Sequence, residues 1–207
     1  MKCQTTDSIR FFDAQFERQV READFALNPF EEAALPYLRG RVLDHGCGLG
    51  NLALAAARNG CCVVALDASR AAIEHLRAAA AAQSLAIEAQ QADLRSHAIE
   101  GQFDAVVSIG LLMFMDCDTA LRELEKLKLH VRPRGVAIVN VLVEGTTYLE
   151  MFGASERCLF KRGEIESRFE GWEKLRLEYS SFDAPGGDVK AFLTLIARKP
   201  AVSTEGA

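Results

Sequence analysis

Residues 43–57, with the sequence LDHGCGLGNLALAAA, carry three glycines at alternate positions, Gly46, Gly48 and Gly50. They stand between an apolar stretch and a helix-forming one. There, glycine lets the backbone turn tightly and approach a ligand at the N-terminus of a helix. A dinucleotide-binding loop of the GxGxxG type needs glycine at position 51, where this chain has Asn51. The spacing therefore favours a ligand other than a dinucleotide.

Three aspartates follow or end consecutive apolar stretches: Asp44, Asp67 and Asp93. Each lies at the carboxyl end of a predicted strand, where open α/β sheets bind ligands. A carboxylate in the position of Asp67 suits two ribose hydroxyls, and Asp93 suits an adenine amino group. Asp44 would repel a diphosphate and attract an ammonium group. Helix caps or turns are the alternative for each aspartate taken singly, but the set of three favours S-adenosylmethionine as the cofactor.

The elements that must position these residues alternate between strands and helices from residue 40 to residue 143. This alternation predicts a parallel sheet with helices on both faces. The predicted strands cover residues 41–45, 62–66, 86–90, 103–109 and 135–143. Two later segments, 173–182 and 189–198, are joined by the turn APGGD and predict an antiparallel hairpin.

Cap residues mark where the helices begin. Ser69 is the expected N-cap of the helix that follows the second strand, and Asp118 that of the helix near residue 120. Asn28, Pro29 and Glu31 form the pattern of a capping box. Before it runs an aromatic stripe at helical spacing, for which a helix packed on the core is the simpler interpretation and a lid over the active site the alternative. The stripe consists of Phe11, Phe12, Phe16, Val20 and Phe25.

Composition narrows the class of protein. The chain has 207 residues, 49% of them hydrophobic, and a net charge of -5, which predicts one α/β domain without a nucleic-acid or membrane partner. The six cysteines form no CxxC pair, so we expect reduced thiols and no metal site. The N-terminus lacks the apolar core of a signal peptide. These features predict a cytoplasmic protein that acts on a small molecule, as a monomer or a homodimer.

In order along the chain stand the motifs VLDHGCGLG, VVALDAS, QADL, FDAVVSIGLLMF and VRPRGVAIV. They resemble the class I S-adenosylmethionine-dependent methyltransferases. The later segments GLLMFMD, FKRGEIESRFEGWEKLRLEY and LTLIARKP resemble, more narrowly, the bacterial tellurite-resistance methyltransferases. The resemblance implies one Rossmann-like domain over residues 1–199, with a seven-stranded sheet of order 3-2-1-4-5-7-6 and an antiparallel last strand. Residues 1–39 would be a helical cap, 144–172 a candidate acceptor-site lid and 200–207 a disordered tail.

The resemblance also assigns the site. It implies that the methionine part of the cofactor lies on Asp44 and the glycine loop, the ribose on Asp67, and the adenine on Asp93 and Leu94. The full set of expected cofactor residues is Asp44, Gly46, Cys47, Gly48, Gly50, Asp67, Ala68, Asp93, Leu94, Ser108, Ile109 and Gly110. The expected acceptor residues are Phe12, Phe16, Met113, Phe114, Tyr148 and Met151.

The expected reaction is methyl transfer from S-adenosylmethionine to a small acceptor, with S-adenosylhomocysteine as product. A sulfonium is already an activated donor, so a soft acceptor such as a thiol, or a selenium or tellurium oxyanion, needs no strong base. No catalytic residue is assigned, and His45 is expected to point away from Asp44 into a packed layer. The alternatives are an NAD(P)-dependent oxidoreductase and a non-catalytic S-adenosylmethionine-binding regulator.

The chain departs from the tellurite-resistance pattern at two places. Ser180 and Ser181 stand where those relatives have a His-Arg pair thought to serve acceptor binding, and Asn51, Leu52 and Ala53 replace Arg-Asn-Ser after the third glycine. Loss of positive groups weakens the case for an oxyanion acceptor. The cofactor prediction is unaffected by these changes.

Overall fold

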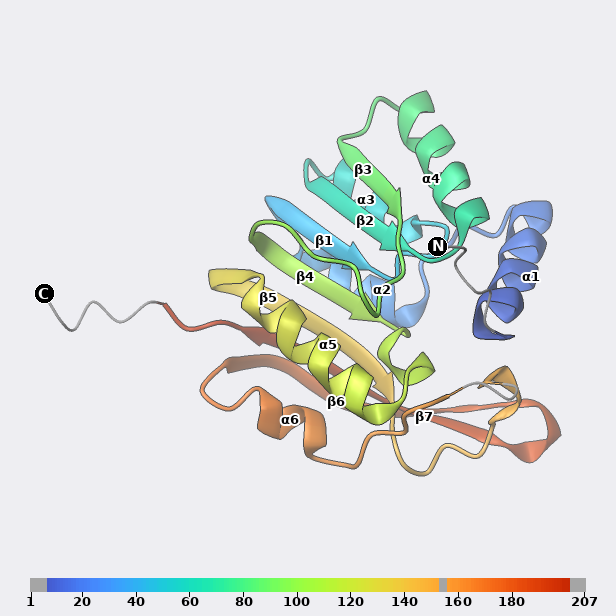
Figure 1. Ribbon diagram of the computed structural model, residues 1–207, viewed down its shortest axis with the longest axis vertical. Coiled ribbons are helices and arrows are strands. Elements are labelled where there is room, and N and C mark those ends of the chain that lie inside the picture. The colour runs from blue at the N-terminus through green and yellow to red at the C-terminus, as the bar shows by residue number, and fades with distance from the viewer. Residues whose placement is uncertain (1–6, 153–155, 202–207) are drawn as a thin grey trace, which may run out of the picture.

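The computed structural model describes residues 7–152 and 156–201, and their side chains from residue 12 onward. Its centre is a seven-stranded sheet of order β3-β2-β1-β4-β5-β7-β6 (Figure 1), as expected. β7 runs antiparallel to both of its neighbours, and the other pairs are parallel. The strands are β1 (Arg41–His45), β2 (Cys62–Asp67), β3 (Ile87–Gln91), β4 (Phe103–Ile109), β5 (Val131–Leu142), β6 (Glu173–Asp183) and β7 (Val189–Arg198).

Helices cover both faces of this sheet, which confirms the predicted fold class. α5 and α6 pack on the face seen at the front of Figure 1, with Leu124 and Ile165 fully buried. α3 and α4 pack on the opposite face, through residues such as Leu52 and Ile73. The helices are α1 (Asp7–Glu22), α2 (Pro29–Ala34), α3 (Asn51–Arg58), α4 (Arg70–Ala82), α5 (Cys117–Leu129) and α6 (Glu164–Arg168). Short 3-10 turns are η1 (Leu35–Tyr37), η2 (Leu112–Phe114), η3 (Glu150–Phe152) and η4 (Pro185–Gly187).

The expected caps are confirmed at two helices and wrong at a third. Ser69 accepts a hydrogen bond from the N–H of Ala72, and Asn28 forms the capping box of α2. α5 begins two residues before the expected position, because Asp116 accepts the N–H of Thr119 at 2.9 Å and Asp118 lies inside the first turn. Two aspartates two residues apart both meet the sequence criterion, so only the backbone position separates them.

β5 begins at Val131, four residues before the expected start at 135. Val131 pairs with Phe103, and the register then shifts before Val136 pairs with Ala105. Arg134 has a positive φ of 64° within this irregular part. α5 ends at Leu129, so Pro133 and Gly135 lie in an irregularity inside the strand, which sequence periodicity does not reveal.

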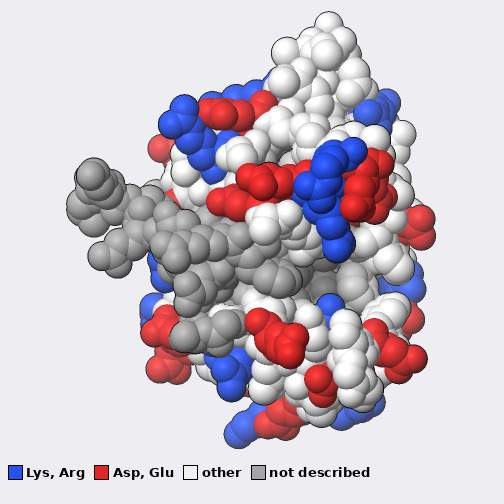
Figure 2. Space-filling view, turned by 90° about the vertical axis from the view of Figure 1, so that its right-hand side faces the viewer, with Lys and Arg blue, Asp and Glu red and all other residues white. Residues whose placement is uncertain are grey.

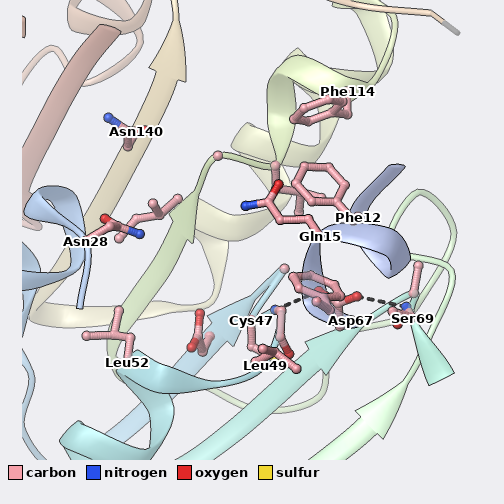
Figure 3. Close-up of a pocket in the computed structure, with 18 of the residues that line it drawn as sticks. Phe12, Gln15, Asn28, Cys47, Leu49, Leu52, Asp67, Ser69, Phe114 and Asn140 are labelled. Carbon is pink, nitrogen blue, oxygen red and sulfur yellow. Dashed lines mark hydrogen bonds between the residues drawn. The ribbon is translucent and has the colours of Figure 1, made fainter. Parts of the chain in front are cut away.

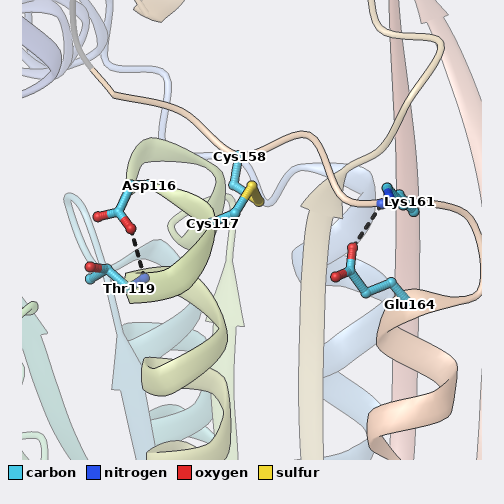
Figure 4. The surroundings of a disulfide bond; sticks show 6 residues. All are labelled: Asp116, Cys117, Thr119, Cys158, Lys161 and Glu164. Atoms are coloured by element: carbon cyan, nitrogen blue, oxygen red, sulfur yellow. Dashed lines mark hydrogen bonds between the residues drawn. A yellow bond between two sulfur atoms is a disulfide. The ribbon is translucent and has the colours of Figure 1, made fainter.

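The prediction of reduced thiols is wrong for two cysteines, because Cys117 and Cys158 form a disulfide (Figure 4). They are 41 residues apart in sequence, and tertiary packing rather than a CxxC motif brings them together. Cys47, Cys61 and Cys62 are free. The bond ties the segment after β5 to the first residue of α5. Disulfides are typical of oxidising compartments, so this pair does not support the predicted cytoplasmic location.

α1 lies beside the carboxyl ends of the central strands, apart from the two helical layers (Figure 1). The Phe12 ring packs edge-on against Phe114 in η2, at 4.8 Å between ring centroids. Val20 and Phe25 remain 44% and 42% exposed, so the side chains of the aromatic stripe are only partly buried. The side chain of Phe11 and the expected tail beyond residue 201 lie outside the described part of the chain. α1 thus contacts η2 through Phe12, while the far end of the aromatic stripe stays exposed.

Among residues 7–152 and 156–201, no helix is both long enough and apolar enough to span a bilayer.

Candidate functional site

A cavity of about 640 Å³ opens at the carboxyl ends of the parallel strands, in the size range of small-molecule sites (Figure 3). Its walls come from the glycine loop after β1, the ends of β2 and β4, the loop after β3, and α1 and α2. β5, β7 and η3 complete it on the far side. The cavity thus lies where the expected cofactor residues converge.

The glycine loop needs glycine for space as well as for backbone shape. Gly48 and Gly50 have φ angles of +53° and +79°, which side chains rarely adopt. A Cβ on Gly50 would lie 2.5 Å from Leu76, and one on Gly48 would lie 3.1 Å from the ring of Phe16. Gly50 also precedes the first residue of α3, so the loop presents backbone N–H groups and a helix N-terminus to the cavity.

Asp67 holds this loop against the end of β2. One carboxylate oxygen accepts the N–H of Gly48 at 2.8 Å, and the other accepts the N–H of Ser69 at 2.8 Å (Figure 3). Burial raises the pKa of Asp67, while these two hydrogen bonds oppose the rise. Each oxygen keeps a second lone pair, so the carboxylate can still accept hydrogen bonds from a ligand.

Asp44 and Glu31 form a pair of carboxyl groups in the cavity wall. Asp44 is 5% exposed, and its Oδ2 has no hydrogen-bond partner among the described residues. Burial, with smaller contributions from Glu31 and Asp67, raises the pKa of Asp44 to about 8. Glu31 accepts the N–H of Asn28 through Oε2 at 2.8 Å, and burial raises its pKa as well. An unpaired buried carboxyl oxygen beside a second carboxyl is suited to a cationic ligand group.

The loop after β3 supplies a third wall. Leu94 is buried and lines the cavity. Asp93 also lines it, but its side chain is 41% exposed and pairs with Arg95, whose Nε lies 3.2 Å from Oδ1. The second oxygen, Oδ2, is in no hydrogen bond recorded among the described residues and faces a more solvated environment than that of Asp44.

The structure brings most of the expected site residues together. Of the expected cofactor residues, all but Ser108 line the cavity, and of the expected acceptor residues, all but Tyr148 do. Ser108 is 1% exposed within β4, and Tyr148 instead carries the ammonium of Lys190 over its ring at 4.7 Å. His45 is fully buried outside the cavity, and burial lowers its pKa to about 3.

An aromatic row closes the side opposite the glycine loop. Phe12 packs on Phe114 at 4.8 Å, and Phe114 packs on Phe152 at 4.9 Å. Met113 and Met151 line the cavity beside this row and are nearly buried. Thioether and aromatic side chains make an apolar, adaptable wall for a second ligand.

Sequence reasoning missed several residues that the fold brings to the cavity. Glu31 is expected from the sequence only as part of a capping box, and Asn140 is not among the expected site residues. Asn140 is 1% exposed on β5 and lines the cavity. A lone amide within an otherwise apolar strand is the signal that could have indicated it. Other lining residues that were not expected include Phe30, Lys190 and Phe192.

Charge is distributed unevenly over the described lining residues. The acidic ones are Glu31, Asp44, Asp67, Asp93 and Glu156, and the basic ones are Arg95 and Lys190. Figure 2 views the molecule from the side of α1, where acidic and basic side chains are interspersed on the described surface. The described lining residues with ionisable side chains are thus mainly acidic. Over the same part of the chain, no three His, Cys, Asp or Glu side chains form a group that could hold a metal ion.

Part of the chain matches a known family model, and curated relatives match it more widely. A model described as a methyltransferase domain matches residues 42–135. Hemagglutinin 1 of Eikenella corrodens is 26% identical over 166 residues, which are 77% of this chain and 55% of that protein. The chain spans about half or less of the length of the curated relatives it matches.

Solved structures share the arrangement of the sheet. TehB from Haemophilus influenzae has a TM-score of 0.75 at 20% identity, over 87% of this chain and 65% of that one. The protein in the structure titled "Conversion of a Disulfide Bond into a Thioacetal Group during Echinomycin Biosynthesis" has a TM-score of 0.65 at 26% identity, over 87% and 86% of the two chains. These matches agree with the resemblance inferred from the motifs: residues 42–135 match the methyltransferase-domain model, and the chain shares its fold with TehB.

Proposed function

We propose that this chain is a class I methyltransferase, which transfers a methyl group from S-adenosylmethionine to a small-molecule acceptor. The observation that supports the cofactor most directly is Oδ2 of Asp44, which is buried, without a partner among the described residues, and next to the glycine loop. An unpaired buried acceptor is costly, by about 1–3 kcal/mol, unless a ligand uses it. The methionine ammonium of S-adenosylmethionine has the right charge and donors.

Each part of the cofactor has a matching group in the cavity. Asp44 and Glu31 would receive the ammonium between them, because both carboxyl groups line the same wall. Asp67 would accept the two ribose hydroxyls while it holds the Gly48 N–H. Asp93 and Leu94 would bind the adenine through the exposed carboxylate and a buried apolar side chain. Ile109 and Gly110, at the end of β4, would line the opposite side.

The chain's own contribution to the reaction is alignment and exclusion of water. When bound, the sulfonium supplies a methyl group on a positively charged leaving group. The acceptor's lone pair forms the new bond to carbon, and the electrons of the broken carbon–sulfur bond return to sulfur, which leaves a neutral thioether. Phe12, Phe114 and Met113 would give an apolar lining to the path by which the acceptor reaches the methyl carbon. No base is required where the attacking atom of the acceptor carries no proton.

A soft nucleophile is the proposed acceptor class. The methionine and aromatic wall supports it, as does the similarity to the protein whose title concerns sulfur chemistry, the conversion of a disulfide to a thioacetal. Tellurite has less support, because the likeness to TehB concerns the fold alone. In addition, Ser180 and Ser181 lie on β6 outside the described lining, so they offer the cavity no positive group.

Two measurements test the proposal. Calorimetry should show S-adenosylhomocysteine binding and no comparable NADH binding, and the reverse result would favour the oxidoreductase alternative. Incubation with S-adenosylmethionine and a panel of thiols, amines and selenite should release S-adenosylhomocysteine with at least one acceptor. Cofactor binding with no turnover on any of them would favour a non-catalytic regulator.

A further inference from the structure

Asn140 occupies an unusual position for an amide. It stands near the end of β5 in a run of buried apolar residues, and it is 1% exposed. Its neighbours two residues away on the strand, Ile138 and Leu142, belong to the clusters of the α2 and α3 side. Because side chains alternate along a strand, Asn140 faces that side too, where it lines the cavity (Figure 3).

The amide has only one orientation that satisfies its surroundings. Nδ2 lies 3.0 Å from Oγ1 of Thr194 and 3.4 Å from the carbonyl oxygen of Leu193, both on β7. A backbone carbonyl can only accept a hydrogen bond, so the nitrogen must face β7. Oδ1 is left without a partner among the described residues. Asn140 therefore offers the cavity an acceptor and keeps its donors occupied.

The surroundings of this oxygen are apolar. Met113, Leu142 and Phe192 form one buried cluster, with Phe30 packed against it. The rings of Phe30 and Phe192 lie 4.7 Å apart. A hydrogen bond made in such surroundings discriminates strongly, because a ligand without the donor leaves Oδ1 desolvated and unpaired.

The same wall lies beside the proposed cofactor site. The N–H of Gly110, at the end of β4, donates to the backbone carbonyl of Asn140 at 3.0 Å. A molecule held at Asn140 would thus be adjacent to the strand end that we propose lines the cofactor. The five acidic lining residues, against Arg95 paired with Asp93 and Lys190 stacked on Tyr148, disfavour an anion there.

We propose that Oδ1 of Asn140 accepts a hydrogen bond from an N–H or O–H group of the methyl acceptor, whose body is apolar and whose net charge is zero or positive. The donor group need not be the atom that is methylated. This inference rests on the proposed function, since it assigns the second substrate of the same cavity. It makes Asn140 a specificity-determining residue and not a base, because an amide takes no proton at neutral pH.

Matched pairs of ligands test the proposed hydrogen bond to Asn140. The ligands carry no free thiol, so they leave the Cys117–Cys158 disulfide intact. The probes are the three isomeric hydroxythioanisoles and the three methylthioanisoles, which differ only by a hydroxyl in place of a methyl group. Binding is measured by calorimetry on the protein loaded with S-adenosylhomocysteine. At one ring position at least, the hydroxylated probe should bind about tenfold more tightly than its methyl partner.

Two variants locate the effect. Asn140→Leu removes the acceptor and should abolish the preference for the hydroxylated probe. Thr194→Val removes only the partner of Nδ2 and should retain a preference. Both should bind S-adenosylhomocysteine within about twofold of the wild type, as a check that they are folded. The wild-type comparison stands even where a variant fails to fold.

Several outcomes overturn the inference without touching the proposed function. The first is that the hydroxythioanisole and the methylthioanisole bind equally at every ring position, and the second is that no hydroxythioanisole binds. The third is that selenite binds more tightly than all six probes. The fourth is that Asn140→Leu keeps the wild-type preference for the hydroxylated probe. Failure of the wild type to bind S-adenosylhomocysteine, by contrast, would overturn the proposed function itself.

Discussion

The two halves of the cavity are built in different ways. The half proposed for the cofactor comes mainly from three short strand-end segments within residues 44–94, where Asp44, Asp67 and Asp93 stand. The half proposed for the acceptor draws on residues from Phe12 to Phe192, and thus on both ends of the chain. The first half is set by local turns after parallel strands, whereas the second depends on how distant elements pack. Substitutions in one half of the cavity should therefore leave the properties of the other half largely unchanged.

The disulfide offers the largest test, because it lies outside the described lining but next to the acceptor half, where the N–H of Cys158 donates to the carbonyl oxygen of Met113 at 3.0 Å. It closes a loop between residues 41 positions apart, and loss of such a link destabilises a fold by about 3–4 kcal/mol. The double variant Cys117→Ser/Cys158→Ser should lose that much unfolding free energy in urea. Its affinity for S-adenosylhomocysteine, measured where it remains folded, should stay close to that of the wild type. A matching loss of affinity would show that the two halves are not independent.

Replacement of Asp67 should have the largest effect within the cofactor half. Asp67→Ala removes the proposed ribose acceptor and frees the N–H groups of Gly48 and Ser69. We expect S-adenosylhomocysteine to bind at least about 100-fold more weakly, equivalent to about 2.7 kcal/mol. Asp183→Ala, at the end of β6 and outside the described lining, is the control and should bind normally. Retained affinity in Asp67→Ala would contradict the ribose role.

The pH dependence of binding should report on Asp44. Its pKa is raised to about 8 in the protein, so the unliganded carboxyl is protonated below that pH, whereas an ammonium partner favours the ionised form. Binding should then release a proton, and the affinity for S-adenosylhomocysteine should rise from pH 6 to about pH 8, by at most about tenfold per unit. Calorimetry in buffers of different ionisation enthalpy measures that proton. An affinity that does not change with pH would contradict the proposed contact between Asp44 and the ammonium group.

The same raised pKa has the opposite consequence for the unliganded fold. Between the ordinary carboxyl pKa of 3.8 and about 8, the folded protein holds a proton that the unfolded chain has lost. The contribution of Asp44 to stability therefore falls as the pH rises through this window. S-adenosylhomocysteine should weaken this fall, because it favours the ionised carboxylate.

The smallest expected effect concerns Glu31, the residue through which α2 joins the cofactor half. Glu31→Gln should weaken the binding of S-adenosylhomocysteine by about tenfold, as expected for loss of one charge from a partly buried ion pair. Methylthioadenosine lacks the amino-acid group and should bind the variant as it binds the wild type. Glu32→Gln, in the exposed neighbour, is the matched control. Equal weakening of both ligands would point to a disturbed fold and not to an ammonium contact.

The sequence predicted the fold more fully than the site. The order of the sheet and the antiparallel β7 were expected from the resemblance and are confirmed, while the boundaries of β5 and the cap of α5 were not foreseen. Most of the expected cofactor residues line one cavity, because each stands at a strand end and parallel strands align those ends. Ser108 and Tyr148 do not line it, since the face on which a side chain lies depends on the surrounding packing.

The amino-acid sequence by itself determined the glycine loop and the three strand-end aspartates, on which the proposed cofactor rests, because these features act through local backbone geometry. Only the tertiary structure decided the rest. It brought Cys117 to Cys158, placed Glu31 beside Asp44, and turned the amide nitrogen of Asn140 toward β7, which leaves its oxygen without a partner among the described residues. These contacts join residues far apart in the chain. Spacing along a sequence carries no information on which distant surfaces will pack together, and that packing defines the acceptor side.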